Sequence, residues 1–361
     1  MQRRGFVSGA ATGLAAGGAL AAPAIAQARH EWNMVMPWPR NTPGVGVGAQ
    51  RFADDVNAMS DGRLTIRLFA AGELVPPFES LDAVQQGVAD LAHGTPYYWV
   101  GKSKALHYFT TIPFGLTATE LAAWIAFGDG QALWEEVYAP FDVKPFYAGS
   151  SGVQAGGWFK RPIESVADLN GLKFRIAGLG GEVMRRQGVN VVLLPPGEIM
   201  PALISGTIDA AEWIGPWNDR AFGLYRAAKY YYVPAFHEPG PGLEIIVNRA
   251  RYEALPADLR KIVEVAAQAA AHQTLADFTF HNIVTFGPLL AEEGVEVRTF
   301  PVDVVEALGR TTREVLAELA ASDPLTGRVH ESFSVFLAEA DRYGRHFDQR
   351  MLEMRSIALE G

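Results

Sequence analysis

The sequence GTIDAAEWIGP, residues 206–216, carries the clearest structural signal in this chain. Gly206 suits the left-handed conformation that ends a helix, Asp209 lies in the turn, and the following alanines indicate a short buried strand. The same pattern, Ala-x3-Gly-x2-Asp-x-Ala, occurs at residues 83–92 and at 202–211. Two copies in the same order predict two lobes of similar build. The alternative is that helix–turn–strand units simply look alike.

Strand and helix patterns alternate on both sides of this stretch. Alternating or continuous short apolar runs predict strands at 32–36, 64–68, 91–92, 243–248 and 295–300, and helical periodicity predicts helices at 49–59, 78–86, 257–293 and 302–321. Such alternation is typical of an α/β fold with parallel strand pairing. Near the end, residues 333–359 form one apolar helical stripe, which covers either the chain's own lobes or a partner.

Composition excludes several classes of protein. The chain has 361 residues, of which 49% are hydrophobic and 20% charged, so it is neither disordered nor fibrous. Asp plus Glu exceed Lys plus Arg by 40 to 31, and this negative balance argues against a nucleic-acid partner. The cysteine count of zero excludes disulfides, thiolate metal sites and a cysteine nucleophile.

The first 26 residues predict an export signal. Arg3 and Arg4 precede Phe6, as in a twin-arginine signal, and a small-residue apolar run leads to a cleavage pattern that ends at Ala26. An uncleaved membrane anchor is the alternative, but the run is too short to span a bilayer and is interrupted by Pro23. We therefore expect a soluble mature protein in the periplasm, cleaved near Ala26.

Motifs for catalysis are weak. The sequence has no His-Glu-x-x-His, no Gly-x-Ser-x-Gly and no phosphate-binding Walker loop. Residues 44–49 fit a dinucleotide fingerprint, but three prolines separate these glycines from the preceding strand, so the tight turn toward a pyrophosphate is missing. A binding protein is therefore a better interpretation than a nicotinamide-dependent enzyme.

Arg175 is the first candidate for binding. It lies near the carboxyl end of a predicted strand at 172–176, where open α/β sheets bind their ligands. A guanidinium there can hold a carboxylate through two parallel hydrogen bonds. A solvated surface arginine is the alternative.

A carboxylate and aromatic rings follow the two repeated turns. Glu212 and Trp213 end one strand, and Tyr98 occupies the equivalent place in the first lobe, so these residues are expected to form two walls of one cleft. A hard cation would take oxygen from Glu212 and nearby carbonyls, and Gln154 would offer a neutral oxygen. The alternatives are core aromatics with one acid at the rim, and an ordinary strand amide at Gln154.

These residues belong to stretches that resemble a known family. The mature chain resembles, over essentially its whole length, the solute receptors of tripartite ATP-independent periplasmic (TRAP) transporters. It looks closest to the branch that binds 2-oxo acids such as pyruvate, and a lactate-binding branch is similar as well. The matching stretches are residues 71–76, 97–102, 152–159, 206–210 and 212–216.

The resemblance implies a two-lobed periplasmic binding protein fold of the α/β class, with a hinge and a long C-terminal helix, that closes on a carboxylate without catalysis. Lobe I is expected at 27–148 plus 242–290, lobe II at 149–241 plus 291–330, and the C-terminal helix at 331–361. The hinge is expected near 148–151 and 239–242.

The resemblance also assigns roles to individual residues. It implies that Arg175 pairs with the ligand carboxylate, and that Gln154, Glu212 and the carbonyl of Trp213 hold a metal ion, sodium in preference to calcium, that also touches the ligand. Further ligand contacts are implied for Tyr98, Glu238 and Ser150. The family pattern differs at three places, namely residues 236–239, residues 150–151 and Trp99.

The implied partners are a small carboxylate, the membrane components of a TRAP transporter, and a second copy of the chain bound through the C-terminal helix. The ligand alternatives are lactate or another 2-hydroxy acid, and a bulkier carboxylate. A rival of another class is an exported lyase that uses Glu212 and Tyr98 as base and acid.

Overall fold

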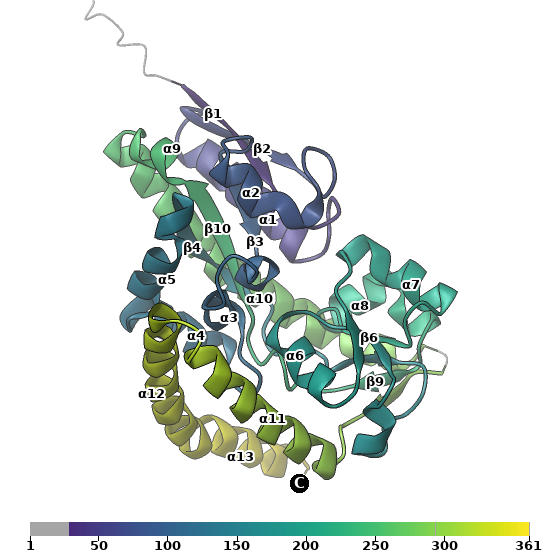
Figure 1. Cartoon of the computed structure of the whole chain (residues 1–361). Coiled ribbons are helices and arrows are strands. Elements are labelled where there is room, and N and C mark those ends of the chain that lie inside the picture. Colours follow the sequence, from purple (N-terminus) through teal and green to yellow (C-terminus); the bar gives the residue numbers. More distant parts are fainter. Residues whose placement is uncertain (1–28, 293, 361) are drawn as a thin grey trace, which may run out of the picture.

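The computed structural model of the chain describes residues 29–292 and 294–360. The export signal predicted at residues 1–26 lies outside the described residues. The described chain forms two lobes, each built around its own β-sheet (Figure 1).

The first sheet has five strands in the order β2-β1-β3-β10-β4. The strands β2, β1 and β3 run parallel, and β10 lies antiparallel between β3 and β4. Their bounds are β1 His30–Val35, β2 Leu64–Phe69, β3 Leu91–Gly94, β4 Val143–Ser150 and β10 Gly242–Asn248. In β2, Leu64, Ile66 and Leu68 are buried, while Arg67 is exposed, as the predicted alternation requires.

Helices pack around this sheet. In α1, Phe52 and Val56 are buried on one face because they are four residues apart and therefore lie one turn above the other. The long α10 contacts β4 and α1 of this lobe, and it also contacts α8 of the other lobe. The bounds are α1 Val45–Met59, α2 Ser80–Gln85, α3 Leu106–Thr110, α4 Ala118–Phe127, α5 Gly130–Tyr138, α8 Pro216–Phe222, α9 Arg249–Glu253 and α10 Ala257–Leu290.

The second sheet has six strands in the order β11-β9-β5-β8-β6-β7. Its parallel part, β7-β6-β8, has the same order of neighbours as β2-β1-β3, and in both sheets an antiparallel strand follows. The two-lobed α/β prediction is therefore confirmed. The bounds are β5 Gly157–Phe159, β6 Lys173–Arg175, α6 Gly178–Arg186, β7 Asn190–Val192, α7 Ile199–Ser205, β8 Ala210–Ala211, β9 Tyr230–Tyr232, β11 Glu296–Arg298 and α11 Val302–Ala320.

Two of the segments that connect the sheets, residues 151–156 and 233–241, pair with each other. The Gln154 amide donates to the Glu238 carbonyl at 3.1 Å, and the Ala235 amide donates to the Gln154 carbonyl at 2.9 Å. Gly240 lies so close to α4 that a Cβ atom there would be 2.1 Å from the Ala118 nitrogen. Both connections are thus fixed to each other and to the first lobe.

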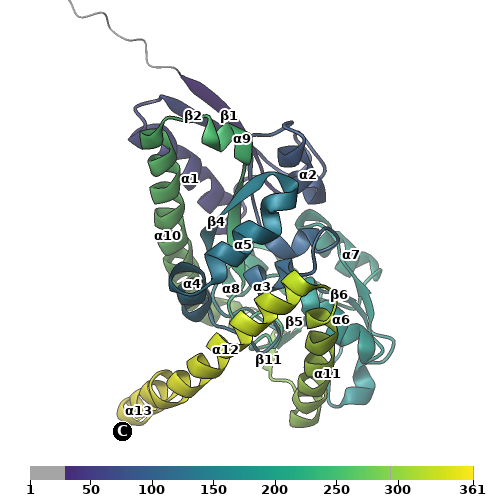
Figure 2. The ribbon, with the colours of Figure 1, turned by 60° about the vertical axis from the view of Figure 1, so that its left-hand side comes forward.

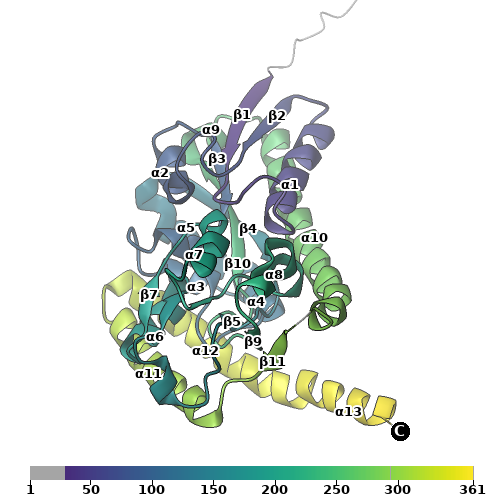
Figure 3. The same cartoon turned by 90° about the vertical axis from the view of Figure 1, so that its right-hand side faces the viewer.

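The C-terminal region is helical, as predicted, but it consists of two helices. The first, α12 Pro324–His346, begins where the Asp323 side chain accepts a hydrogen bond from the Thr326 amide at 2.8 Å. The second is α13 Asp348–Glu360. Figures 2 and 3 show α12 crossing the molecule and α13 extending away from its body to the C-terminus.

The predicted apolar stripe divides between these two helices. Phe333 packs against Tyr108 and Trp124 of the first lobe and Ala340 is also buried, whereas Tyr343, Met351 and Met354 are more than half exposed. The beginning of the stripe therefore packs within the chain and its end does not. Within residues 29–292 and 294–360, no helix is long and apolar enough to cross a membrane.

Candidate functional site

The site lies at the carboxyl ends of two neighbouring parallel strands. Arg175 is the last residue of β6, Glu212 directly follows β8, and the register pairs Arg175 with Ala211. Parallel strands end at the same edge of a sheet, which is where such folds bind ligands. The sequence placed both residues at strand ends, and the fold puts the two strand ends side by side.

Arg175 is 1% exposed and is held on one side only. Its Nε donates to the Leu194 carbonyl at 3.2 Å, and its Nη1 donates to the Glu212 carbonyl at 3.0 Å and also pairs with Glu212 Oε1. Among the described residues, nothing accepts a hydrogen bond from Nη2. The guanidinium therefore keeps one fixed, buried donor for a further acceptor.

Glu212 is also 1% exposed, and its two oxygens differ. Oε1 pairs with Arg175 and accepts a hydrogen bond from the Ala177 amide at 3.0 Å, whereas Oε2 has no partner in the described part of the chain. Burial is the largest influence on Glu212 and opposes its ionisation, but the Arg175 guanidinium, His237 and the Ala177 amide together outweigh burial and hold the pKa of this carboxyl below its ordinary value. The site thus contains one ionised carboxylate oxygen that is free to bind a cation.

Gln154 supplies a second free oxygen. Its Nε2 donates to Ser151 Oγ at 2.8 Å, and within the described ranges its Oε1 has no hydrogen-bond donor. Ser150 is buried at the end of β4, where its Oγ accepts a hydrogen bond from the Gly152 amide at 3.1 Å. Ser151, not Ser150, is among the residues that line the cavity.

Aromatic rings from both lobes enclose a small cavity next to Arg175, whose guanidinium lies 5.7 Å from the Trp213 ring; Arg175, Glu212 and Glu238 themselves do not line it. Trp38 of the first lobe lies 5.7 Å from Tyr98 and 6.4 Å from Trp213 of the second lobe, measured between ring centroids. They enclose a cavity of about 20 Å³, which is room for about one water molecule. The cavity is lined by Trp38, Val45, Thr95, Tyr97, Tyr98, Ser151, Gln154, Trp213, Ile214, Pro241 and Leu243. A small acid can therefore enter only if the lobes or side chains move apart.

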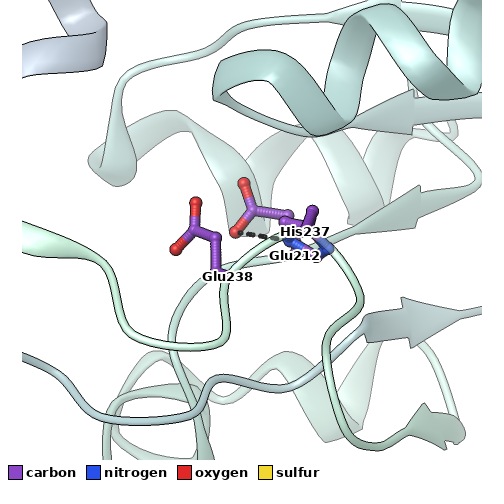
Figure 4. A group of neighbouring side chains, drawn as sticks. All are labelled: Glu212, His237 and Glu238. Atoms are coloured by element: carbon purple, nitrogen blue, oxygen red, sulfur yellow. Dashed lines mark ion pairs between the residues drawn. The ribbon is translucent and has the colours of Figure 1, made fainter. Parts of the chain in front are cut away.

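Glu238 and His237 lie on the connection between β9 and β10, and both are 1% exposed. The His237 Nε2 lies 3.9 Å from Glu212 Oε2. Neither ring nitrogen of His237 and neither carboxylate oxygen of Glu238 has a hydrogen-bond partner in the part of the chain that the structure describes. Figure 4 shows the three side chains gathered in one place, with the dashed line between Glu212 and His237.

The pKa values of Glu238 and Glu212 are shifted in opposite directions. Burial raises the pKa of Glu238 well above its ordinary value, and the nearby charge of Glu212 raises it further. Glu238 is therefore expected to be protonated when no cation is near. His237 had no role in the sequence interpretation, because a single histidine in a connecting segment carries no motif; only the fold brings it beside two glutamates.

Comparison with known proteins agrees with this geometry. A family model described as "Bacterial extracellular solute-binding protein, family 7" matches residues 34–323. The chain belongs to this family. The prediction of a solute receptor, not an enzyme, is thereby confirmed, and this family 7 protein is a periplasmic solute-binding protein.

Relatives of this family 7 protein cover nearly its whole length. A monocarboxylate 2-oxoacid-binding periplasmic protein of Nostoc sp. is 42% identical over 314 residues, which are 87% of this chain and 86% of the relative. A TRAP solute-binding protein from Bordetella bronchiseptica, crystallised as a dimer with calcium and picolinate in an active site, has a TM-score of 0.90 at 33% identity and covers 92% of this chain and 99% of its own. A TRAP periplasmic solute-binding protein from Pseudoalteromonas atlantica with bound sodium and pyruvate has a TM-score of 0.88 at 38% identity, over 90% of this chain and 99% of its own. The resemblance to TRAP receptors is confirmed.

Proposed function

We propose that this family 7 receptor binds a small 2-oxo monocarboxylate such as pyruvate, together with one cation. The observation that carries the proposal is the free Nη2 of the buried Arg175, which has no acceptor among the described residues although it lies beside Glu212. A ligand carboxylate would supply that acceptor in a charge-assisted hydrogen bond. The names of the relatives from Nostoc sp. and P. atlantica support the 2-oxo acid as ligand.

The size of the site supports a small ligand. A micromolar complex needs about −8 kcal/mol. An acid of about six heavy atoms reaches that value only if almost every atom is used, at a ceiling of about −1.5 kcal/mol per atom. Buried polar atoms without partners in the described chain, next to aromatic walls from both lobes, are the surroundings in which a ligand of this size can use every atom. Lactate and other 2-hydroxy acids have nearly the same size and remain the second candidates.

The donor set fits an alkali or alkaline-earth cation. Gln154 Oε1 and Glu212 Oε2 are buried oxygens without partners in the described chain, and hard cations prefer oxygen ligands. Gln154, Glu212 and the Trp213 carbonyl would hold the ion, which would supply positive charge to the ligand. We favour sodium over calcium because Glu212 is already paired with Arg175, so one monovalent ion suffices to balance a monoanionic ligand.

The proposal also includes the remaining ligand contacts, the closure of the lobes, and the export and transport role of the receptor. Tyr98, Glu238 and Ser150 border the ligand, Ser150 from a position behind Ser151, which lines the cavity. Lobe I, 27–148 plus 242–290, and lobe II, 149–241 plus 291–330, close on it about a hinge near 148–151 and 239–242. The mature protein, cleaved near Ala26 after twin-arginine export, delivers the acid to the membrane components of a TRAP transporter.

A homodimer through the C-terminal helix completes the proposal. The apolar side chains of α13 support it: Met351, Leu352, Met354 and Ile357 are all more than half exposed. The B. bronchiseptica relative was crystallised as a dimer.

Calorimetry tests the ligand assignment directly. Chelated and dialysed mature protein is titrated with pyruvate, lactate and a branched 2-oxo acid, each with sodium, with calcium and with neither. We expect pyruvate to bind most tightly and to require a cation. Equal affinity for pyruvate and lactate would move the assignment to the wider class of small acids, and no binding of any of the acids would overturn it.

A further inference from the structure

Three buried side chains offer ligand atoms around one point beside the proposed binding site. One atom each from Glu212, His237 and Glu238 lies within 4.8 Å of the other two. The proposed acid and sodium already involve Glu212 and Glu238, but not His237. They leave the two ring nitrogens of His237 without a partner in the described chain. An unpaired, fully buried imidazole costs free energy, so a ligand for it is expected.

The fold builds a place for this imidazole. His237 packs against α6 at Gly180, where a Cβ atom would lie only 2.4 Å from the Cβ of His237. The backbone of the segment is also held, because Thr111 Oγ1 donates to the His237 carbonyl at 3.2 Å and the Gln154 amide donates to the Glu238 carbonyl at 3.1 Å. The histidine is therefore positioned by both lobes and is not a mobile loop residue.

The donor set of this cluster differs from that of a sodium or calcium site. Those ions take oxygen ligands, whereas one imidazole nitrogen with two carboxylate oxygens suits zinc and similar divalent ions. Tetrahedral ligands at zinc distances are about 3.4 Å apart. His237 Nε2 and Glu212 Oε2, at 3.9 Å, need to approach by about half an ångström, and the two pairs with Glu238, which lie within 4.8 Å, by at most about 1.4 Å.

We infer that Glu212, His237 and Glu238 form a site for a zinc-class divalent cation. Three protein ligands leave the fourth position of a tetrahedral ion open. A 2-oxo acid can fill that position with its carboxylate oxygen while Arg175 Nη2 binds the other one. Because Glu212 Oε2 belongs to both ligand sets, the divalent ion replaces sodium instead of joining it.

The role of the acid in this inference rests on the proposed function, but the metal site can be tested without any acid. Tag-free mature protein is titrated with Zn²⁺ by calorimetry, and with Co²⁺ while its visible d–d absorption is recorded. The chain has no cysteine, so thiolate bands cannot confuse the spectrum. The variants are His237→Gln and, as a matched control, His272→Gln, which makes the same change at an exposed histidine of α10.

We expect one Zn²⁺ per chain in the wild type and in His272→Gln. His237→Gln should weaken Zn²⁺ binding by at least about 100-fold and remove the Co²⁺ absorption, since even indirect neighbours of metal ligands change affinity by about 10- to 100-fold. Glu238→Gln, which keeps the shape of the side chain, should weaken Zn²⁺ binding as well. Glu238→Gln therefore tests the site independently if circular dichroism shows that His237→Gln does not fold.

Unchanged Zn²⁺ affinity and Co²⁺ absorption in both variants would overturn the inference, as would a wild type that binds no Zn²⁺. Neither result touches the proposed function, because pyruvate binding by the wild type in sodium is measured separately. Conversely, a wild type that binds Zn²⁺ through His237 but no small acid would refute the proposed function and leave the metal site standing.

Discussion

Arg175 and Glu212 form an ion pair in which both side chains are 1% exposed and each keeps one polar atom without a partner in the described chain. A fully satisfied buried pair would be weak evidence for anything beyond structure. Here the two atoms without partners differ: Nη2 of Arg175 can donate to an anion, and Oε2 of Glu212 can bind a cation. The pair therefore presents a donor for an anion and an acceptor for a cation at one point.

Replacing Arg175 should abolish acid binding. Arg175→Ala removes the donor for the carboxylate, and we expect the affinity for pyruvate to fall by about 100-fold or more. It should also lower the free energy of unfolding by about 3–5 kcal/mol, because Glu212 loses its buried partner. Arg175→Lys keeps the charge but not the planar fork, so it should recover stability better than affinity. Calorimetry and urea unfolding measure the two effects, with the exposed Arg185→Ala as control. Undiminished pyruvate affinity in Arg175→Ala would contradict the site.

Glu244 should make stability depend on pH. This carboxyl on β10 is fully buried, and it accepts hydrogen bonds from Trp99 Nε1 at 2.8 Å and Tyr138 Oη at 2.8 Å. Burial raises the pKa of Glu244 to about 8 from a value of 4.5. Between these values the folded chain keeps a proton that the unfolded chain releases, so stability is lost as pH rises, by about 1.4 kcal/mol per pH unit.

The variant Glu244→Gln cannot ionise and should remove this part of the pH dependence. Between pH 5 and pH 8 we expect the free energy of unfolding of Glu244→Gln to fall less steeply than that of the wild type. The difference in slope should be about 1.4 kcal/mol per pH unit, which corresponds to one proton. Urea titrations at four pH values measure the slope, and Glu314→Gln on α11 serves as an exposed control. Parallel slopes in wild type and Glu244→Gln would show that Glu244 is ionised in the folded protein.

Gly180 should be sensitive to a single methyl group. Gly180→Ala places a Cβ 2.4 Å from the Cβ of His237, so either α6 or the connecting segment must shift, at about 1–3 kcal/mol. Gly309→Ala, also within a helix, meets no atom closer than 3.9 Å and should stabilise the protein by about 0.5–1 kcal/mol. Thermal unfolding compares the two. If both substitutions stabilise the protein, His237 does not pack on α6 as described.

Removal of α13 tests the dimer. A chain that ends at residue 347 lacks the exposed apolar residues from Met351 to Ile357, and we expect it to be a monomer at concentrations where the complete mature chain is a dimer. Light scattering after size-exclusion chromatography gives both masses. Circular dichroism should show that the shortened chain still folds, since no residue of α13 is buried. A complete chain that stays monomeric at every concentration would refute the dimer.

The sequence predicts the architecture of this protein well because its signals are local. Strand alternation around Leu64 and the repeated turn before Glu212 each occupy about ten residues, and short segments of this kind specify elements and their ends. Local signals also place Arg175 and Glu212 at strand ends, but that the two strands are neighbours is known only from the fold. The break at Phe347 was not predicted, because the apolar period continues through it and a single glycine, Gly344, does not by itself end a helix.

The cluster around His237 could not be predicted from local patterns. Its three members come from a strand end and a connecting segment 25 residues later, and no metal motif has that spacing. The notch at Gly180 that admits the imidazole belongs to a third element. Contacts of this kind depend on how the lobes are joined, and the periodicity of a single segment carries no such information.

The pairing of residues 151–156 with residues 233–241 has a consequence for the order in which the ion and the acid bind. Gln154 and Glu238 sit on these connections and are joined by the hydrogen bond from the Gln154 amide to the Glu238 carbonyl. A rotation of one lobe against the other displaces atoms near the axis least, so it separates Tyr98 from Arg175 while Gln154 and Glu238 stay almost in place. If the lobes rotate about these connections, as we propose, an ion bound near the hinge would stay in the open receptor, and the acid would arrive second and leave first.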